Sequence, residues 1–196
     1  MRRLLVVTVL SLILGPTLPS AQAAVWRVKE GSEVVFISKA SIESFDGKTR
    51  HVRGHIACDL ERLLGPVELA IEVDLASLDT GISLRNKHMR ERHLETGKFP
   101  LAVFTAEEVI AASAAALAPG ATETVTVRGQ FVLHGVTHQR EITARVSLAA
   151  GGVLTVAADF PVKLSDHDIS RPTFLVLRLA DEQQVAVRLV MAPEAP

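Results

Sequence analysis

Two parts of the chain carry acidic and histidine side chains that could do acid–base chemistry. Asp79 and His88 flank a charged segment, and Asp166-His167-Asp168 form a second group. An imidazole and a carboxylate activate a nucleophile when the fold brings them together. However, the chain has no G-x-S-x-G nucleophile elbow and no phosphate-binding glycine loop. Adjacent residues on a turning chain point apart, which favours a solvated loop at Asp166. The pattern predicts a protein that is not an enzyme. The alternative is an enzyme that acts on a lipid or sugar through Asp79, His88 and Asp166.

Three histidines raise the question of a metal site. His88 and His93 are five residues apart, which splays them on a helix, and no H-E-x-x-H motif or cysteine pair is present. His134 lies in a tight hairpin, where a hydrogen bond within the turn explains it. We therefore expect no metal and no cofactor.

Cys58 is the single cysteine, so the chain has no internal disulfide and must be stabilised by its core. It lies among apolar residues of one strand face. We expect it to act as a small buried hydrophobic residue rather than as a reactive thiol.

Strict alternation of apolar and polar residues defines the elements that hold these side chains. It occurs over 67–75, 125–133, 142–148, 154–160 and 185–191. A period of two with one apolar face is typical of antiparallel strands that face solvent on one side. Weaker strands begin at Val34, at Val52 and at Leu101. Turns are predicted at Asp46-Gly47, Gly65-Pro66, Pro119-Gly120, Gly135 and Gly151-Gly152.

The segment from Ser83 to Glu95 breaks the alternation, and Ser83 is able to cap a short helix in a crossover between strands. The alanine-rich stretch 111–118 is predicted to be a loop or a strand end. About eight strands with one buried face predict an all-β, eight-stranded antiparallel barrel, because closure removes exposed edges. No linker or repeat divides it into more than one domain.

A barrel of this size either packs solid or holds one ligand. Gly54, Gly129, Ala144 and Ala158 fall on the inward face, and the chain has no tyrosine. Small inner residues leave apolar volume that hydrocarbon fills best. The alternative is that the glycines relieve crowding at strand bends and the interior is solid. Periodicity alone does not decide between the two.

The first residues resemble a secretory leader. Arg2 and Arg3 precede an apolar run from Leu4 to Leu14, and Ala21-Gln22-Ala23 is a small-x-small cleavage site. We expect cleavage after Ala23, which leaves 24–196 as one exported domain. A membrane anchor would need nearer twenty apolar residues. Removal of two arginines shifts the formal charge from −1 to about −3, so the sequence offers no basic field for nucleic acid and predicts no stable membrane insertion.

Several segments, in order along the chain, resemble the YceI family of exported, lipocalin-like proteins. The strongest likeness lies in the stretch from Glu72 to Gly81 and in the Arg85-Asn86 pair, where the family usually has Asp after the arginine. The other similar segments are Trp26, Ser32 to Phe36, Val52-Arg53-Gly54, Lys98 to Phe104, Val127-Arg128-Gly129, Leu133 to Thr137 and Phe160 to Pro172.

This resemblance implies a barrel in the periplasm of a Gram-negative bacterium that binds a polyisoprenoid or an isoprenoid quinone as ligand. It also implies a possible homodimer.

The predicted function is that of a carrier that sequesters a long isoprenoid or a similar lipid. The residues expected to line its cavity are Phe36, Val52, Ile56, Val73, Phe104, Val127, Phe131, Leu133, Val156 and Phe160. Asp79, Arg85 and His88 are expected at the mouth, where Arg85 could hold a phosphate or quinone oxygen. The competing interpretation of this loop is that Asp79 caps backbone N–H groups and pairs with Arg85. A packed module that binds a partner protein is a third hypothesis.

Overall fold

The computed structural model describes residues 23–39, 44–171, 173–174 and 177–194. Residues 1–22 of the predicted leader, 1–23, lie outside the described residues. No helix in the described part of the chain has both the length and the apolar character needed to cross a membrane.

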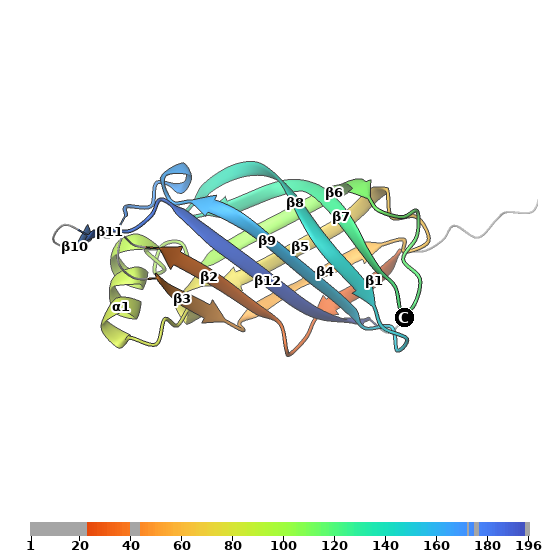
Figure 1. Cartoon of the computed structure of the whole chain (residues 1–196), viewed down its shortest axis with the longest axis horizontal. Coiled ribbons are helices and arrows are strands. Elements are labelled where there is room, and N and C mark those ends of the chain that lie inside the picture. The colour runs from red at the N-terminus through yellow and green to blue at the C-terminus, as the bar shows by residue number, and fades with distance from the viewer. Residues whose placement is uncertain (1–22, 40–43, 172, 175–176, 195–196) are drawn as a thin grey trace, which may run out of the picture.

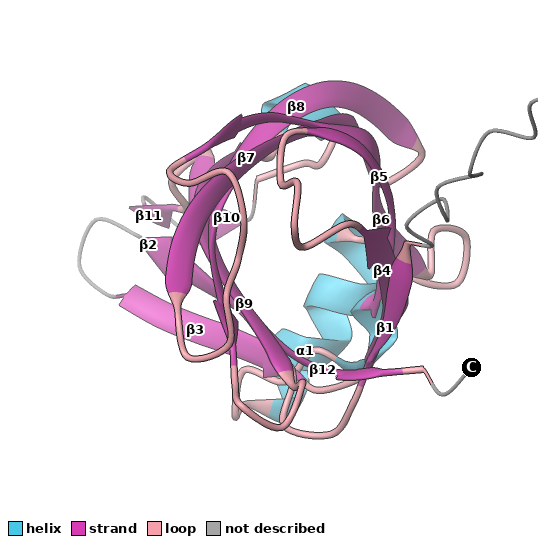
Figure 2. Cartoon of the chain, turned by 90° about the vertical axis from the view of Figure 1, so that its right-hand side faces the viewer, coloured by secondary structure: helices cyan, strands magenta, loops and turns pink. Residues whose placement is uncertain are grey.

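Eight antiparallel strands form a closed barrel, as predicted (Figure 1). Around the ring they are β1 (Ala24–Val28), β4 (Val52–Cys58), β5 (Gly65–Asp74), β6 (Leu101–Ala112), β7 (Thr122–Leu133), β8 (Val136–Leu148), β9 (Leu154–Lys163) and β12 (Glu182–Pro193). The pairing of β1 with β12 closes the ring. Seen along its axis, the barrel is a continuous ring of strands (Figure 2).

Two further strands extend the wall at the end where the helix lies. β2 (Glu33–Lys39) pairs with β12 over Gln184 to Arg188, whereas β1 pairs with β12 over Met191 to Pro193. β3 (Ser44–Thr49) pairs with β2. A separate two-stranded hairpin consists of β10 (Thr173–Phe174) and β11 (Leu177–Arg178).

The two earliest predicted turns are wrong. Asp46 and Gly47 lie within β3, and Gly65 is the first residue of β5. Gly47 is directly opposite Phe36, and a Cβ on Gly47 would overlap the Phe36 ring. The glycine is therefore needed for space beside an aromatic ring rather than for a turn.

The helix lies across one opening of the barrel (Figure 2). α1 (Ser83–His88) follows the short 3₁₀ turn η1 (Leu75–Ser77) and continues into a π-helical turn, η2 (Met89–His93). Ser83 is the first helical residue and does not cap the helix: Ile82 occupies the N-cap position without a side-chain hydrogen bond. A second 3₁₀ turn, η3 (Ser165–His167), follows β9 at the same end.

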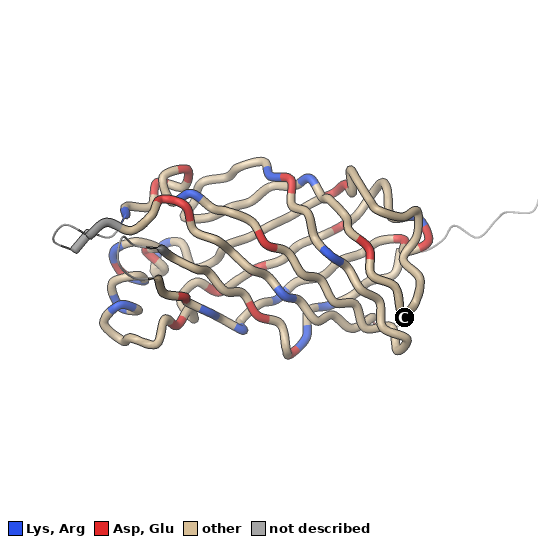
Figure 3. The backbone as a smooth tube through the Cα atoms, viewed as in Figure 1, with Lys and Arg blue, Asp and Glu red and all other residues tan. Residues whose placement is uncertain are grey.

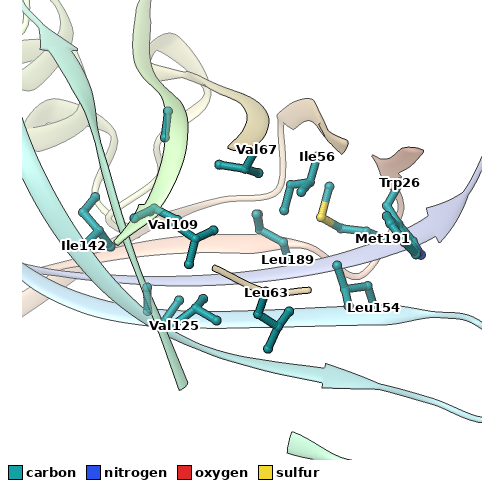
Figure 4. Close-up of a cluster of buried hydrophobic side chains, with 14 of the residues drawn as sticks. Trp26, Ile56, Leu63, Val67, Val109, Val125, Ile142, Leu154, Leu189 and Met191 are labelled. Atoms are coloured by element: carbon teal, nitrogen blue, oxygen red, sulfur yellow. The ribbon is translucent and has the colours of Figure 1, made fainter. Parts of the chain in front are cut away.

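The apolar interior divides into two contact clusters. The loop-end cluster contains Trp26, Leu63, Leu117, Leu154 and Met191, and side chains from facing strands meet there (Figure 4). Leu117 lies in the predicted loop after β6 and is 3% exposed, so this loop closes the end away from the helix. The helix-end cluster consists of Leu75, Leu78, Phe131, Leu133, Val162 and Ile169.

Candidate functional site: the barrel interior

The ten residues predicted to line a cavity share the inward face of the barrel. Ile56 and Val127 belong to the loop-end cluster, and Phe131 and Leu133 belong to the helix-end cluster. The half-buried members that pack against these clusters are Phe36, Val52, Phe104, Val156 and Phe160. Val73 is directly opposite Val52 and alternates with the buried Ile71, so it faces inward too.

Three phenylalanines mark the boundary between the two clusters. Phe104 and Phe131 are opposite each other on β6 and β7, and the rings of Phe131 and Phe160 meet edge to face with centroids 6.2 Å apart. Phe104 and Phe160 pack against both clusters. An apolar guest that extends along the barrel axis would pass these rings.

Some inward side chains keep part of their surface accessible. Phe104 points inward from β6, and Val156 and Phe160 point inward from β9, yet each is only half-buried. In a close-packed core, side chains enclosed by a barrel would have almost no accessible surface. Their remaining exposure therefore indicates unfilled space inside the wall.

Two hollows in the described part of the chain lie on the outer wall instead. They have volumes of about 220 and 370 Å³ and share Arg53 and Glu72, two charged residues of β4 and β5 that form an ion pair. Charged walls do not suit hydrocarbon. The support for a ligand space is therefore the remaining exposure of the inward side chains, and not these two hollows.

The two inner glycines do not create that space. A Cβ on Gly54 would overlap the carbonyl oxygen of Ala70, and one on Gly129 would overlap that of Thr105. The Phe104 ring also covers Gly129, since its Cζ would lie 2.8 Å from the added Cβ. The prediction that these glycines leave volume is wrong: they let neighbouring strands approach closely. Ala144 and Ala158 do face inward, opposite each other.

The segment between β5 and α1 contains Asp79, one of the predicted mouth residues. Asp79 accepts hydrogen bonds from Gly81 N (2.8 Å) and Asn86 Nδ2 (2.7 Å). The backbone bond from Gly81, followed by the bond from Asn86, lowers the pKa of the Asp79 carboxyl. Asp79 thus caps backbone, as one interpretation expected, but its side-chain partner is Asn86 and not Arg85.

Arg85, a residue of α1, binds back to the same loop. Its Nε donates to Thr80 Oγ1 (2.9 Å) and its Nη2 donates to the Thr80 carbonyl (2.7 Å), while the guanidinium lies 4.1 Å from the centroid of the Phe45 ring. The two hydrogen bonds use two of its five N–H donors and hold the guanidinium against the loop. His88, the last residue of α1, is half-buried.

Asn86 was not predicted as a structural residue of this loop. It is buried, and its Oδ1 accepts from both Thr80 N (2.9 Å) and Thr80 Oγ1 (2.7 Å). With its Nδ2 on Asp79, one amide joins the strand end to the helix. The sequence feature that could have indicated this role is the asparagine itself, since the YceI family usually has Asp after the arginine at this position.

A group of histidines ties other segments together at the helix end. His134 adopts a left-handed φ of 53°, and its ring contacts the His167 carbonyl (3.0 Å) and Glu95 Oε2 (2.9 Å). These partners lie outside the hairpin, so the predicted bond within the turn is wrong. His138 Nε2 donates to the Asp166 carbonyl at 2.7 Å. Together the contacts hold η3 against β7 and β8.

The described residues do not form the group of side chains that the metal site or the catalytic site would need. Within the described ranges, no group of three or more His, Cys, Asp or Glu residues could hold a metal ion. His93, half-buried in η2, bonds through Nδ1 to the Ser170 carbonyl at 2.9 Å. No hydrogen bond among the described residues links Asp79, His88 and Asp166.

Cys58 packs against the loop-end cluster. Burial, with a smaller contribution from the charge of Asp59, raises the pKa of its thiol to about 11. A thiol with that pKa is almost entirely protonated at neutral pH and is a poor nucleophile. The side chain therefore behaves as the small hydrophobic residue expected.

Charged residues are distributed along the strands of the barrel (Figure 3). Pairs such as Arg128 with Glu141 (3.0 Å) join neighbouring strands on the outer face. Polar outside and apolar inside, the wall separates the interior from solvent.

Solved structures of other proteins share this fold. A polyisoprenoid binding domain from Saccharophagus degradans aligns with a TM-score of 0.71 at 20% identity, over 88% of this chain and 100% of its own. Burkholderia cenocepacia BcnA aligns with a TM-score of 0.71 at 18% identity, over 83% of this chain and 98% of its own. The YceI protein of Campylobacter jejuni aligns with a TM-score of 0.62 at 18% identity, over 80% of this chain and 88% of its own.

No curated protein matches the chain. The model of the YceI-like domain family, however, matches residues 26–191, which span the barrel from β1 to β12. Because this match covers almost all of the described structure, the chain belongs to the YceI family.

Proposed function

We propose that this protein is an exported carrier that holds a long isoprenoid chain, or a similar lipid, inside its barrel. The observation that carries the proposal is the inward face: two apolar clusters occupy it, yet Phe104, Val156 and Phe160 are incompletely covered. An unfilled apolar space is stabilised by a hydrocarbon guest because water gains no hydrogen bonds there. Binding would gain about 25 cal/mol per Å² of apolar surface buried, less the entropy of ordering the chain.

Two further observations support this ligand class. The chain belongs to the YceI family, and one protein of the same fold is described as a polyisoprenoid binding domain. The residues proposed to contact the ligand are the ten inward residues named above.

Export to the periplasm is part of the proposal. The positive start, the apolar run and the small-x-small site ending at Ala23 support it. We propose no catalytic role and no cofactor, since the polar loop at Asp79 and Arg85 is occupied by its own hydrogen bonds. The packed-module alternative is disfavoured by the accessible inward side chains.

The test is mass spectrometry of an organic extract of the protein, expressed from its full-length sequence in a bacterial host and purified from the periplasm. We expect an isoprenoid lipid at near-stoichiometric yield. Absence of any apolar ligand, together with failure of the purified protein to bind added isoprenoid, would contradict the proposal.

A cavity-filling variant sharpens this test. Val156→Trp places a large side chain in the unfilled space, whereas Thr155→Trp places it on the outer face of the same strand. We expect Val156→Trp to lose the lipid and remain folded, and Thr155→Trp to keep it. If the interior is already packed solid, Val156→Trp will instead unfold the barrel through overpacking.

A further inference from the structure

Two large apolar side chains are exposed close together at the start of α1. Ile82 is 52% exposed and Leu84 is 62% exposed, which makes them the most exposed large apolar residues in the described part of the chain. Gly81 and Ser83 are exposed as well, so residues 81–84 form a continuous exposed segment. Single exposed leucines are normal on a protein surface, but apolar residues that gather at one place mark an interaction site.

The segment that follows is basic, although the chain as a whole is slightly acidic. Residues 81–98 include five Lys and Arg residues and two Glu residues, whereas the whole chain has a formal charge of −1. Lys87 and Arg92 are exposed, and neither forms an ion pair with any described residue. Of the two glutamates, Glu95 is bound to His134 at 2.9 Å. The segment therefore carries a local excess of positive charge.

Helix geometry places these charges beside the apolar residues. Leu84 and Lys87 are three residues apart in α1, and residues at that spacing are neighbours on a helix surface. Lys87 and Arg92 are five apart, the spacing of neighbours in a π-helical turn such as η2, into which α1 continues. Asn86 is buried on another face of the helix, where it binds Asp79. The exposed face thus has an apolar start and basic side chains along its length.

This exposed face lies at one end of the barrel. α1 is at the far left of the molecule in Figure 1, and Figure 2 shows the helix across one opening. The loop end also has an exposed leucine, Leu64, which is 50% exposed. However, the turn before Leu64 contains Asp59 and Glu61 against one basic residue, Arg62. The loop end therefore has the apolar residue without an excess of positive charge.

We propose that the exposed face of α1 and η2 docks this protein reversibly on an anionic lipid bilayer. Ile82 and Leu84 enter the interface, and Lys87 and Arg92 lie on the lipid phosphates. Apolar side chains flanked by Lys and Arg are the pattern by which amphipathic helices lie in a bilayer interface. The negative charge of the lipids complements the basic face. Docking does not depend on the carrier function, but together the two would bring the helix end of the barrel to the membrane that supplies or receives its lipid.

The test is flotation with lipid vesicles, for protein expressed and purified from the periplasm as above. The intact mass should first establish that residues 1–23 are absent, since that apolar run would bind vesicles by itself. We expect binding to vesicles of phosphatidylcholine mixed with phosphatidylglycerol and little binding to phosphatidylcholine alone. Binding to the mixed vesicles should weaken at high salt, because salt screens exposed charges.

Two double variants separate the electrostatic from the apolar contribution. Lys87→Gln with Arg92→Gln should weaken binding to the mixed vesicles about fivefold for each charge removed. Ile82→Gln with Leu84→Gln should weaken it about tenfold, because less apolar surface enters the bilayer. All four side chains are exposed, so urea denaturation should give each variant the stability of the wild type.

The loop end supplies the matched controls. Leu64→Gln and Arg62→Gln change the same residue types at the opposite end and should leave vesicle binding at the wild-type level. The docking surface is wrong if the wild-type protein binds neither kind of vesicle or binds both equally. Equal losses in the loop-end and helix variants would also contradict it.

Two further outcomes distinguish this proposal from its neighbours. A dimer in size-exclusion chromatography that Leu84→Gln dissociates would mean that a second copy of the chain covers the face, and the membrane proposal would fail. A protein that retains no lipid and binds no isoprenoid, yet still floats with the mixed vesicles, would overturn the carrier function and leave the docking surface standing.

Discussion

Lys48 and Asp79 are joined by two backbone hydrogen bonds, each N–H donating to the other residue's carbonyl at 3.0 Å. Lys48 lies in β3, whose other edge pairs with β2, and Asp79 begins the loop that leads to α1. The pair therefore connects the extended wall to the chain beyond β5. Asp79 also binds Asn86 of α1 through its carboxylate. The attachment of β3 and the position of the helix therefore depend on the same residue.

Replacing Asn86 should loosen this loop. Asn86→Ala removes three hydrogen bonds and leaves the N–H and hydroxyl of Thr80 without their acceptor. We expect the free energy of unfolding to fall by about 2 kcal/mol or more, measured by urea denaturation. Asn86→Asp keeps the acceptor but loses the donor toward Asp79, so its loss should be intermediate. The exposed neighbour Lys87 provides the control, and an equal effect of Lys87→Ala would contradict this account.

Gly129 tests the close approach of β6 and β7. Gly129→Ala would push a Cβ into the Thr105 carbonyl and the Phe104 ring. We expect a destabilisation of about 2 kcal/mol, typical of overpacking, in urea or thermal unfolding. Gly97 is the matched control, because nothing lies within 4 Å of its added Cβ. Tolerance of Gly129→Ala would mean that the strands have room that the structure does not show.

His167 should make stability depend on pH. Burial, then the nearby charges of His138 and Arg140, lowers its pKa in the folded state, so the unfolded chain binds more protons at mildly acidic pH. Stability conferred by the neutral ring is complete above the unfolded pKa of about 6.5 and is lost as pH falls toward the folded pKa.

Urea denaturation at several pH values between 7.5 and 5 measures this dependence. The wild-type free energy of unfolding should decline toward acid, and the decline should be shallower in His167→Phe. The same slope in wild type and His167→Phe would show that His167 does not titrate with unfolding. His51→Phe serves as the exposed control.

Cys58 should resist alkylation in the folded protein. With its thiol pKa raised to about 11 by burial, little thiolate forms at pH 8. Iodoacetamide should modify the native protein slowly and the urea-unfolded protein rapidly, as followed by the mass of the intact chain. Rapid modification of the native protein would place Cys58 in an open position instead of against the loop-end cluster.

Much of the barrel could be predicted from local pattern. An apolar residue at every second position specifies a strand with one buried face, which is why 67–74, 125–133 and 154–160 lie in strands with their apolar residues inward. The inward positions of the ten cavity residues follow from the same alternation. Local pattern failed at Asp46-Gly47. An Asp-Gly pair is typical of a turn, but here the glycine makes room for the Phe36 ring within a strand, and the two cases look the same in the sequence.

The sequence alone determined most of the barrel strands, their inward faces and the apolar character of the two clusters, because alternation is a property of neighbouring residues. Only the tertiary structure decided which polar atoms meet. Asp79 with Asn86, and His167 with Leu133 and Phe131, are brought together by strand register, by η3 and by the π-helical turn. Spacing along the chain does not specify such contacts, since they form between segments that approach only after the barrel has closed.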